Sequence, residues 1–230
     1  MIFFAQGYPQ STYNKTVYFY GDSVYTLNSV KGIVKDDSNI YLSSAIVDIF
    51  TGQKLAVIKS TMQGIVVGKI LFHDSLAKIP TYPTNTLIMD RNGDLLVASN
   101  KTWNHTKYVD AYVVKLNKGL DTLWTRVFDL PATAAGYPQD TILLNFATAI
   151  KQTPDGGYIV TGNYRRIPQG TIDDRACLLK IDTDGNVQWW RAYPNVLNAY
   201  AIEITADSGF LLPTGKEPRG YKIIRLDKTG

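Results

Sequence analysis

Asp182, Asp184 and Asn186 stand at alternating positions around Gly185, which is how a calcium-binding loop begins. Carboxylate and amide oxygens at this spacing can surround a calcium ion on one side. A complete EF-hand loop also needs a bidentate glutamate at its twelfth position, and that position is Tyr193 in this chain. The stretch lacks an essential ligand, so we expect a turn here and no metal site.

The two adjacent glycines in the segment "QTPDGGYIVTG" could belong to a phosphate-binding loop. A phosphate-binding glycine loop leads into the N-terminus of a helix. Gly156 and Gly157 instead precede an apolar run of β-forming residues, and Asp-Gly before such a run is typical of a hairpin turn. We therefore interpret both glycines as turn residues and expect no cofactor.

Nucleophilic and metal-assisted catalysis find little support in the remaining residue types. His73 and His105 are far apart, and neither has a serine, a cysteine or a second histidine at a suitable spacing. Cys177 is the single cysteine and lies in the apolar run "RACLLKID", which predicts a buried thiol rather than a nucleophile. We expect no catalytic residues on these grounds.

Composition limits the partners that the chain can have. Its 24 basic and 20 acidic residues give a net charge of +4, which is spread along the chain, whereas a nucleic-acid surface needs clustered basic residues. No stretch approaches the roughly 18 apolar residues of a membrane span. The N-terminal "MIFFAQ" (residues 1–6) has two interpretations that stay open, the remnant of a secretory signal peptide or an ordinary first strand.

The turn at Gly156 belongs to a pattern that recurs four times along the chain. Each copy is a polar turn followed by an apolar β-forming run, and the copies begin after Lys35, Asp90, Thr153 and Thr205. They read "DDSNIYLSS", "RNGDLLVAS", "PDGGYIVTG" and "ADSGFLLPT", at intervals of about 50–65 residues. Recurrence at this spacing predicts a repeat architecture.

A second pattern follows each copy of the first, as "GIVVGKILFHD", "AYVVKLNKGLDTLW", "ACLLKIDTDGNVQWW" and "GYKIIRLDKTG". A basic residue lies inside each apolar run, in order Lys69, Lys115, Lys180 and Arg225. The segments "WTRVF" and "WWRAY" align without a gap, and we expect their tryptophans to pack between neighbouring repeats. The positions that we assign to the repeat framework are Gly93, Gly156, Gly157, Gly209, Lys115, Lys180, Arg225, Trp124 and Trp189.

Short strands separated by turn signals fill each unit, and no stretch has convincing helical periodicity. Units of about 45–65 residues with about four strands, stacked face to face, are the blades of a β-propeller. We predict an all-β fold in which residues 7–230 form four blades, with approximate limits 17–78, 79–128, 129–193 and 194–230. We expect an open arc of a larger ring; the alternative is a closed four-bladed propeller in which residues 17–20 pair with residues 221–226.

The segments "AIKQTPDGGYIVTGNY" and "LLKIDTDGNVQWWRAY" together resemble the repeat of secreted bacterial β-propeller proteins, often found with a type IX secretion sorting tail. The resemblance spans residues 19–230 and is strongest over residues 147–193. It implies a bacterial protein that is secreted or held at the cell surface, with further repeats or domains in the full-length protein. "KIDTDGNVQW" is also distantly similar to the tryptophan-docking repeat of quinoprotein dehydrogenases, a similarity between propellers that does not imply the cofactor.

The connections between the first and second apolar runs should share one face of the propeller, because the units repeat. They read "NKTWNHTKYVD", "NYRRIPQGTIDD" and "KEPRG" and supply Trp103, His105, Tyr108, Tyr164, Arg165, Arg166 and Arg219. Aromatic and basic groups on converging loops suit a sugar, carboxylate or protein ligand. We expect a non-enzymatic binding or scaffold module for a glycan or protein ligand.

Two other functions stay open at this stage. An extracellular glycan-active hydrolase or lyase would draw its acids from loops, for example Asp173 and Asp174, and would need two carboxylates about 5–10 Å apart in a pocket. A pure spacer in a larger surface protein would have no pocket lined by Trp103, Tyr164 or Arg165.

Overall fold

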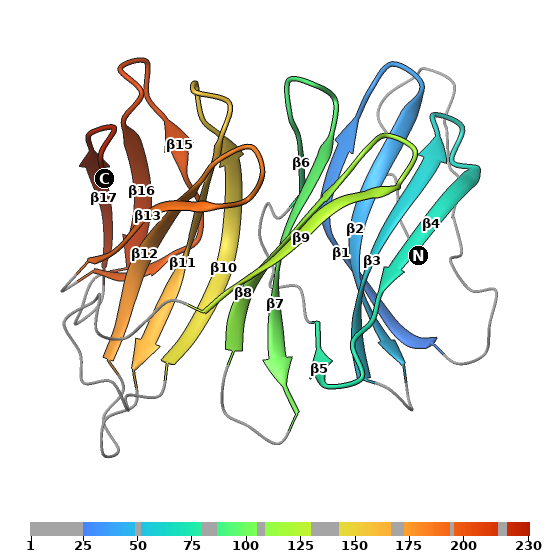
Figure 1. The fold of residues 1–230 in the computed structure, drawn as a ribbon, viewed down its shortest axis with the longest axis horizontal. Coiled ribbons are helices and arrows are strands. Elements are labelled where there is room, and N and C mark those ends of the chain that lie inside the picture. Colours follow the sequence, from blue (N-terminus) through green and yellow to red (C-terminus); the bar gives the residue numbers. More distant parts are fainter. Residues whose placement is uncertain are drawn as a thin grey trace.

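The computed structural model describes residues 25–48, 52–79, 87–104, 109–129, 143–166, 173–193, 196–215 and 220–230. These residues form β-strands and turns, and none of them belongs to a helix (Figure 1). The all-β prediction is therefore confirmed. The segments that we assigned to a signal remnant (residues 1–6) and to a ring-closing strand (residues 17–20) lie outside the described residues.

The strands form four antiparallel sheets, which we call blades 1 to 4. Blade 1 contains β1 (Tyr25–Lys35), β2 (Asn39–Asp48), β3 (Gly52–Thr61) and β4 (Val66–Phe72). Blade 2 contains β6 (Leu87–Met89), β7 (Leu95–Trp103), β8 (Val109–Leu116) and β9 (Thr122–Phe128), with β5 (Ala77–Lys78) on the edge of β7. Blade 3 contains β10 (Leu143–Gln152), β11 (Tyr158–Arg166), β12 (Asp173–Ile181) and β13 (Val187–Tyr193), and blade 4 contains β14 (Leu197–Ala199), β15 (Glu203–Ile204), β16 (Phe210–Gly215) and β17 (Tyr221–Leu226).

The blades stand side by side, with blade 1 and blade 4 at opposite ends of the long axis (Figure 1). Blades 2 and 3 touch through one parallel pair, Leu144 with Val109. Within the described chain β1 pairs only with β2 and β17 only with β16, so no ladder joins the first blade to the last. The arrangement is the open arc of propeller blades that the repeats predict.

Apolar cores fill the spaces between neighbouring blades. Leu55 and Val57 meet Val97 and Val114 between blades 1 and 2, Leu96 and Val113 meet Tyr158 and Val160 between blades 2 and 3, and Ile159 and Leu178 meet Phe210 and Leu212 between blades 3 and 4. Every residue of β8 is buried, which explains why its run is apolar on both faces. Burial of this surface is the main force that holds one blade against the next.

In blades 2, 3 and 4 the basic residue of the repeat neutralises an acid in the turn of the same blade. Lys115 lies 3.1 Å from Asp94, and Lys180 lies 3.0 Å from Asp155. In blade 4 the counterpart is Arg225, whose guanidinium lies 2.7 Å from the carboxylate of Asp207. The repeated basic residues therefore have a structural partner.

The structure corrects the basic residue that we assigned to the first repeat. Lys59 on β3 pairs with Tyr41 in the register in which Lys115 pairs with Leu96, whereas Lys69 belongs to the following strand, β4. Lys59 Nζ donates a hydrogen bond to the carbonyl oxygen of Lys118 in blade 2, at 2.9 Å. The error arose because the apolar run of β3 carries no turn signal of the kind seen in the other units.

The two repeat tryptophans lie against a glycine of the next blade. The Trp124 ring covers Gly185, and its Nε1 donates to the carbonyl oxygen of Thr183 at 3.2 Å. The Trp189 ring covers Gly230 in the same way. Both glycines end a polar turn with positive φ, 80° and 85°, so each supplies a left-handed conformation and a side-chain-free surface for the ring.

Between blades 1 and 2 the large and the small residue of this contact have changed sides. Gly68 pairs with Lys59, as Trp124 pairs with Lys115, so glycine occupies the tryptophan position in blade 1. The opposing turn position holds Leu120, which keeps a positive φ of 72° and is buried. A large residue meets a small one at each of these contacts, so volume is conserved although the residue types are reversed.

Replacing Gly185 with alanine should lower the free energy of unfolding by about 1–2 kcal/mol, because an L-residue at this φ is strained. The added Cβ would also lie 2.9 Å from Arg126 and 3.2 Å from the Trp124 ring. Gly220→Ala is the matched control, since nothing lies within 4 Å of the Cβ that it would add. Urea unfolding of the two variants measures the difference; equal stability of both would contradict the contact.

The turn glycines themselves have two different roles. Gly93 and Gly156 have φ values of 84° and 89°, the conformation that a glycine adopts without strain. In blade 4 Ser208 takes this conformation, with a φ of 65°. Gly157 and Gly209 instead allow a close approach of the backbone, because a Cβ on either would lie 2.4 Å from a carbonyl oxygen of the neighbouring strand.

Two asparagines, the buried Asn100 and the partly buried Asn163, connect their blades to the first strand of the next blade. The Asn100 side chain accepts a hydrogen bond from Ala147 N at 2.8 Å and donates one to Ala147 O at 3.4 Å. Asn163, at the same repeat position in blade 3, accepts from Ala199 N at 3.0 Å. Ala147 and Ala199 both lie at register shifts of their strands. The amides thus satisfy backbone groups that an irregular ladder leaves unpaired.

Candidate functional site

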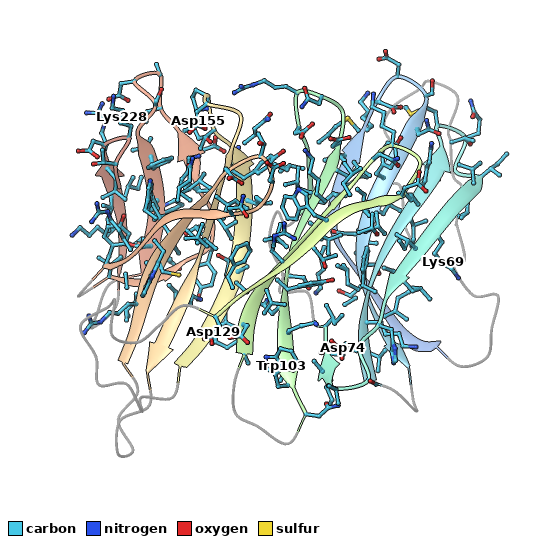
Figure 2. All side chains as sticks on the ribbon, in the orientation of Figure 1. Lys69, Asp74, Trp103, Asp129, Asp155 and Lys228 are labelled. Carbon is cyan, nitrogen blue, oxygen red and sulfur yellow. The ribbon has the colours of Figure 1, made fainter. Side chains whose placement is uncertain are left out.

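The arc has two rims with different structures (Figure 2). The turn rim carries the tight turns that begin at Asp90, Asn117, Thr153 and Asp182, each closed by backbone hydrogen bonds. The loop rim carries the ends of β7, β11 and β16, from which the three candidate loops leave (Figure 1). Asp155 and Lys228 lie at the turn rim, whereas Asp74, Trp103 and Asp129 lie at the loop rim (Figure 2).

Of the seven candidate ligand residues, the structure describes the side chain of one and the backbone of three others. Trp103 ends β7 and is described with its side chain. Tyr164, Arg165 and Arg166 form the last residues of β11, and the structure describes their backbone. The three others, His105, Tyr108 and Arg219, lie outside the described residues. The loop rim therefore brings the ends of the candidate strands to one side of the molecule, and only Trp103 has a defined side-chain environment.

Trp103 is held in one orientation by its neighbours on β7 and β8. Its indole Nε1 donates a hydrogen bond to Asp110 Oδ2 at 2.6 Å. Lys101 and Trp103 are two residues apart on one strand and share a face, which places the Lys101 ammonium 5.1 Å from the Trp103 ring centroid. The same ammonium lies 5.4 Å from the ring centroid of Tyr112. The Trp103 indole is therefore half-buried, with its Nε1–H bonded to Asp110 and its ring beside the Lys101 ammonium.

Asp74 completes this cluster from the segment that follows blade 1. Its carboxylate forms an ion pair with Lys101 at 2.5 Å and accepts a hydrogen bond from Leu76 N at 2.8 Å. These hydrogen bonds, led by the one from Lys101, lower the pKa of the Asp74 carboxyl. The Asn104 N–H donates to Leu76 O at 2.8 Å and fixes the segment beside β7. Sequence reasoning missed Asp74 because its partners lie 27 residues away along the chain.

The acids that we considered for catalysis lie opposite the candidate arginines. On β11 and β12, Arg165 pairs with Asp174 and Arg166 pairs with Asp173 in the strand register. The register therefore places the backbone of the two arginines beside that of the two aspartates.

The aspartate turn at 182–186 uses its oxygens internally. Asp182 Oδ1 accepts from the backbone N–H groups of Asp184 and Asn186 at 2.9 and 2.8 Å, and Oδ2 accepts from Asn186 Nδ2 at 2.9 Å. The side-chain hydrogen bond from Asn186 contributes most to the lowered pKa of the Asp182 carboxyl. In the part of the chain that the structure describes, no group of three histidine, cysteine or acidic side chains is placed to hold a metal ion.

Cys177 is buried and lines a small apolar cavity of about 10 Å³ together with Ala111, Phe146 and Leu179. Burial raises the pKa of its thiol to about 12, so the thiol is neutral at physiological pH. A cavity of this size has room for at most one water molecule, which is too little for a ligand.

The part of the chain that the structure describes contains no helical segment that could span a membrane.

No protein-family model matches the chain, and no curated protein matches it. Among solved structures, the chain is similar to an endo-arabinase from Bacteroides thetaiotaomicron (TM-score 0.46, 14% identity, 85% of this chain and 72% of that one). It is also similar to a hypothetical protein from Leishmania major (TM-score 0.29, 12% identity, 90% and 87% coverage). A third is a mannose phosphorylase from Leishmania mexicana in complex with phosphate ion (TM-score 0.32, 12% identity, 90% and 85% coverage). The propeller assignment rests on the sheet topology described above.

Proposed function

We propose that the chain is a binding module that holds a glycan on its loop rim. The observation that carries the proposal is the fixed Trp103 indole, which stands at the strand end from which residues 105–108 leave. The apolar face of a sugar ring packs on an indole, and an indole that is already oriented loses little entropy on binding. The Lys101–Asp74 ion pair, whose side chains are 14% and 22% exposed, supplies charged groups at this rim for sugar hydroxyls, while the buried Asp110 holds the indole.

The other candidate residues extend this surface in the proposal. Tyr164, Arg165 and Arg166 end β11 on the same rim, and His105, Tyr108 and Arg219 belong to the loops that leave it. A location outside the cell or at its surface, and membership of the secreted bacterial propeller family, are further parts of the proposal that rest on the repeat resemblance. Additional repeats in a longer protein and a protein ligand at this rim are likewise proposals.

Replacing Trp103 with alanine should weaken glycan binding at least about tenfold, which corresponds to about 1.4 kcal/mol. A printed glycan array identifies an oligosaccharide, and calorimetric titration of that oligosaccharide into wild type and variant measures the change. Trp124→Phe is the matched control, because it alters a tryptophan on the turn rim and should leave the affinity unchanged. Equal affinity of wild type and Trp103→Ala, or no glycan bound by wild type, would contradict the proposal.

The same samples separate a binding module from a glycan-active enzyme. Wild-type protein incubated with the bound oligosaccharide should release no new reducing ends over a day. Release that depends on Asp173 or Asp174 would instead favour the hydrolase or lyase, for which the sequence offered these two acids as examples.

A further inference from the structure

Asn92 and Gly93 form the tip of the turn that connects β6 to β7 on the turn rim. Asn92 is exposed, and it is the one asparagine of the sequence that a glycine follows. Glycine has no Cβ, so its main-chain nitrogen is open to the side chain of the residue before it. That nitrogen is a nucleophile and the side-chain carbonyl carbon of asparagine is an electrophile, so the two neighbours can react with each other.

Two other turns have the same geometry but a different residue before the glycine. Gly93, Gly156 and Gly185 all have positive φ, and the N–H of each donates to the carbonyl oxygen three residues earlier. The residues before the second and third of these glycines are Asp155 and Asp184. A carboxylate is a poorer electrophile than the neutral amide of asparagine. The turn at Asn92 is therefore the reactive one of the three.

Asp90 holds this turn closed through three backbone N–H groups. Its Oδ1 accepts hydrogen bonds from Asn92 N and Asp94 N, both at 2.9 Å, and its carbonyl oxygen accepts one from Gly93 N at 2.9 Å. Gly93 N has to leave its bond to Asp90 before it can reach the Asn92 side chain. The reaction therefore starts from the open turn, and its rate depends on how often the turn opens.

We propose that Asn92 is a site of spontaneous deamidation whose rate Asp90 controls. In the open turn Gly93 N bonds to Asn92 Cγ, and the side-chain nitrogen leaves as ammonia, which carries away the proton of Gly93 N–H. Water then hydrolyses the resulting succinimide at one of its carbonyl carbons. Hydrolysis at Cγ gives aspartate. Hydrolysis at the main-chain carbonyl carbon gives isoaspartate, in which the backbone runs through Cγ.

The isoaspartate product changes the joint between blades 2 and 3. It lengthens the backbone of the turn by one carbon atom, so the three N–H groups no longer all fit onto Asp90. Asp90 also accepts the hydrogen bond of the Tyr158 hydroxyl at 2.7 Å and lies 3.3 Å from Lys115 Nζ. Deamidation thus displaces a residue that contacts blade 3, and molecules with isoaspartate should be less stable than unmodified ones.

Incubation of the full chain at mildly alkaline pH, followed by proteolysis and mass spectrometry, tests the site. The peptide that contains Asn92 should show conversion of the amide to an acid, partly as isoaspartate. Asn104 and Asn186 are internal controls, because both are exposed but are followed by His105 and Val187, whose side chains hinder the attack. Deamidation at an equal rate in all three positions, or none at Asn92, overturns the proposal.

Two variants test the control by Asp90. Asp90→Ala should deamidate at Asn92 at least about tenfold faster than wild type, because two of the three bonds that close the turn are gone. Asn100→Ala is the matched control, since it weakens the contact between the same two blades and leaves the turn of Asp90 intact. An equal increase in both variants would show that global unfolding exposes Asn92, which contradicts control by the turn.

A peptide of residues 89–97, "MDRNGDLLV", gives the same comparison without a change of sequence. It lacks the contacts of the folded blade and should deamidate at least about tenfold faster than the full chain. Equal rates in peptide and chain contradict protection by the closed turn.

The effect on stability has its own control. The isoaspartate fraction, separated by chromatography, should unfold at a lower urea concentration than Asn92→Asp, which adds the same charge without lengthening the backbone. Equal stability of the two would contradict the link between the turn and the joint of blades 2 and 3.

Discussion

Replacing Asp90 with alanine should lower the free energy of unfolding by about 3–5 kcal/mol, because it removes the fully buried one of the two carboxylates that Lys115 contacts and leaves the Tyr158 hydroxyl without its acceptor. Lys115 Nζ lies 3.3 Å from Asp90 Oδ2, and the Asp90 side chain is fully buried. Tyr158 of blade 3 donates a hydrogen bond to the same oxygen at 2.7 Å. The substitution removes a charge, a hydrogen-bond acceptor and one of the contacts between blades 2 and 3.

Urea unfolding at neutral pH measures this loss. Asp207→Ala is the matched control, because Asp207 pairs with Arg225, the counterpart of Lys115 in blade 4, and both side chains are more than half exposed. Exposed ion pairs contribute about 0–1 kcal/mol, so the control should remain close to wild type. A difference of less than about 1 kcal/mol between Asp90→Ala and Asp207→Ala would contradict the role of burial.

The same cluster should make stability depend on pH. Burial alone would raise the pKa of the Asp90 carboxyl, but hydrogen bonds from Tyr158 and from Asp94 N, together with the Lys115 charge, lower it overall. A lowered folded-state pKa gives stability that is present above the unfolded value of 3.8 and is lost as the pH falls through the folded value. Unfolding measured between pH 7 and pH 2 should therefore have a shallower acid limb in Asp90→Asn than in wild type.

At alkaline pH the titration of Tyr158 has the opposite effect, a loss of stability as the pH rises. Burial, and then its bond to Asp90, raises the pKa of Tyr158 to about 12 from 10. This contribution to stability is fully present below pH 10 and is lost as the pH rises towards 12. Tyr158→Phe, which has no phenol to titrate, should lack that loss.

Asn100→Ala should lower the free energy of unfolding by about 2–5 kcal/mol, since it leaves both backbone groups of Ala147 buried without the asparagine. An unpaired buried N–H or C=O costs about 1–3 kcal/mol. The methyl group of alanine cannot replace either bond.

Asn104→Ala is the control for Asn100→Ala, because Asn104 also bonds a backbone carbonyl, that of Ser75, but at an exposed site. Its effect should stay within about 0.5 kcal/mol of wild type. Thermal and urea unfolding of the two variants compare the same residue change at two depths. Similar losses in both would show that the amide at position 100 does not secure the neighbouring blade.

The sequence by itself determined the repeat unit, its turns and its strands. Asp-Gly and Asn-Gly turns before apolar runs specify local dihedral angles and a period of two, which no distant contact has to supply. The same local reasoning identified Trp124 and Trp189 as packing residues, and the structure places both on glycines of the next blade. It failed in the first repeat, where Lys59 and Gly68 replace the expected residues, because that unit keeps the geometry of the others with reversed side-chain volumes.

Only the tertiary structure decided which residues meet between blades. Asn100 reaches Ala147 and Tyr158 reaches Asp90 across 47 and 68 residues, and the cluster around Trp103 gains Asp74 from a different segment. The matched positions of Asn100 and Asn163 in "ASN" and "TGN" were a visible signal, but their partners were not. A polar side chain in an apolar run needs a hydrogen-bond partner when it is buried. The sequence does not identify that partner, because the way in which two sheets pack against each other determines it.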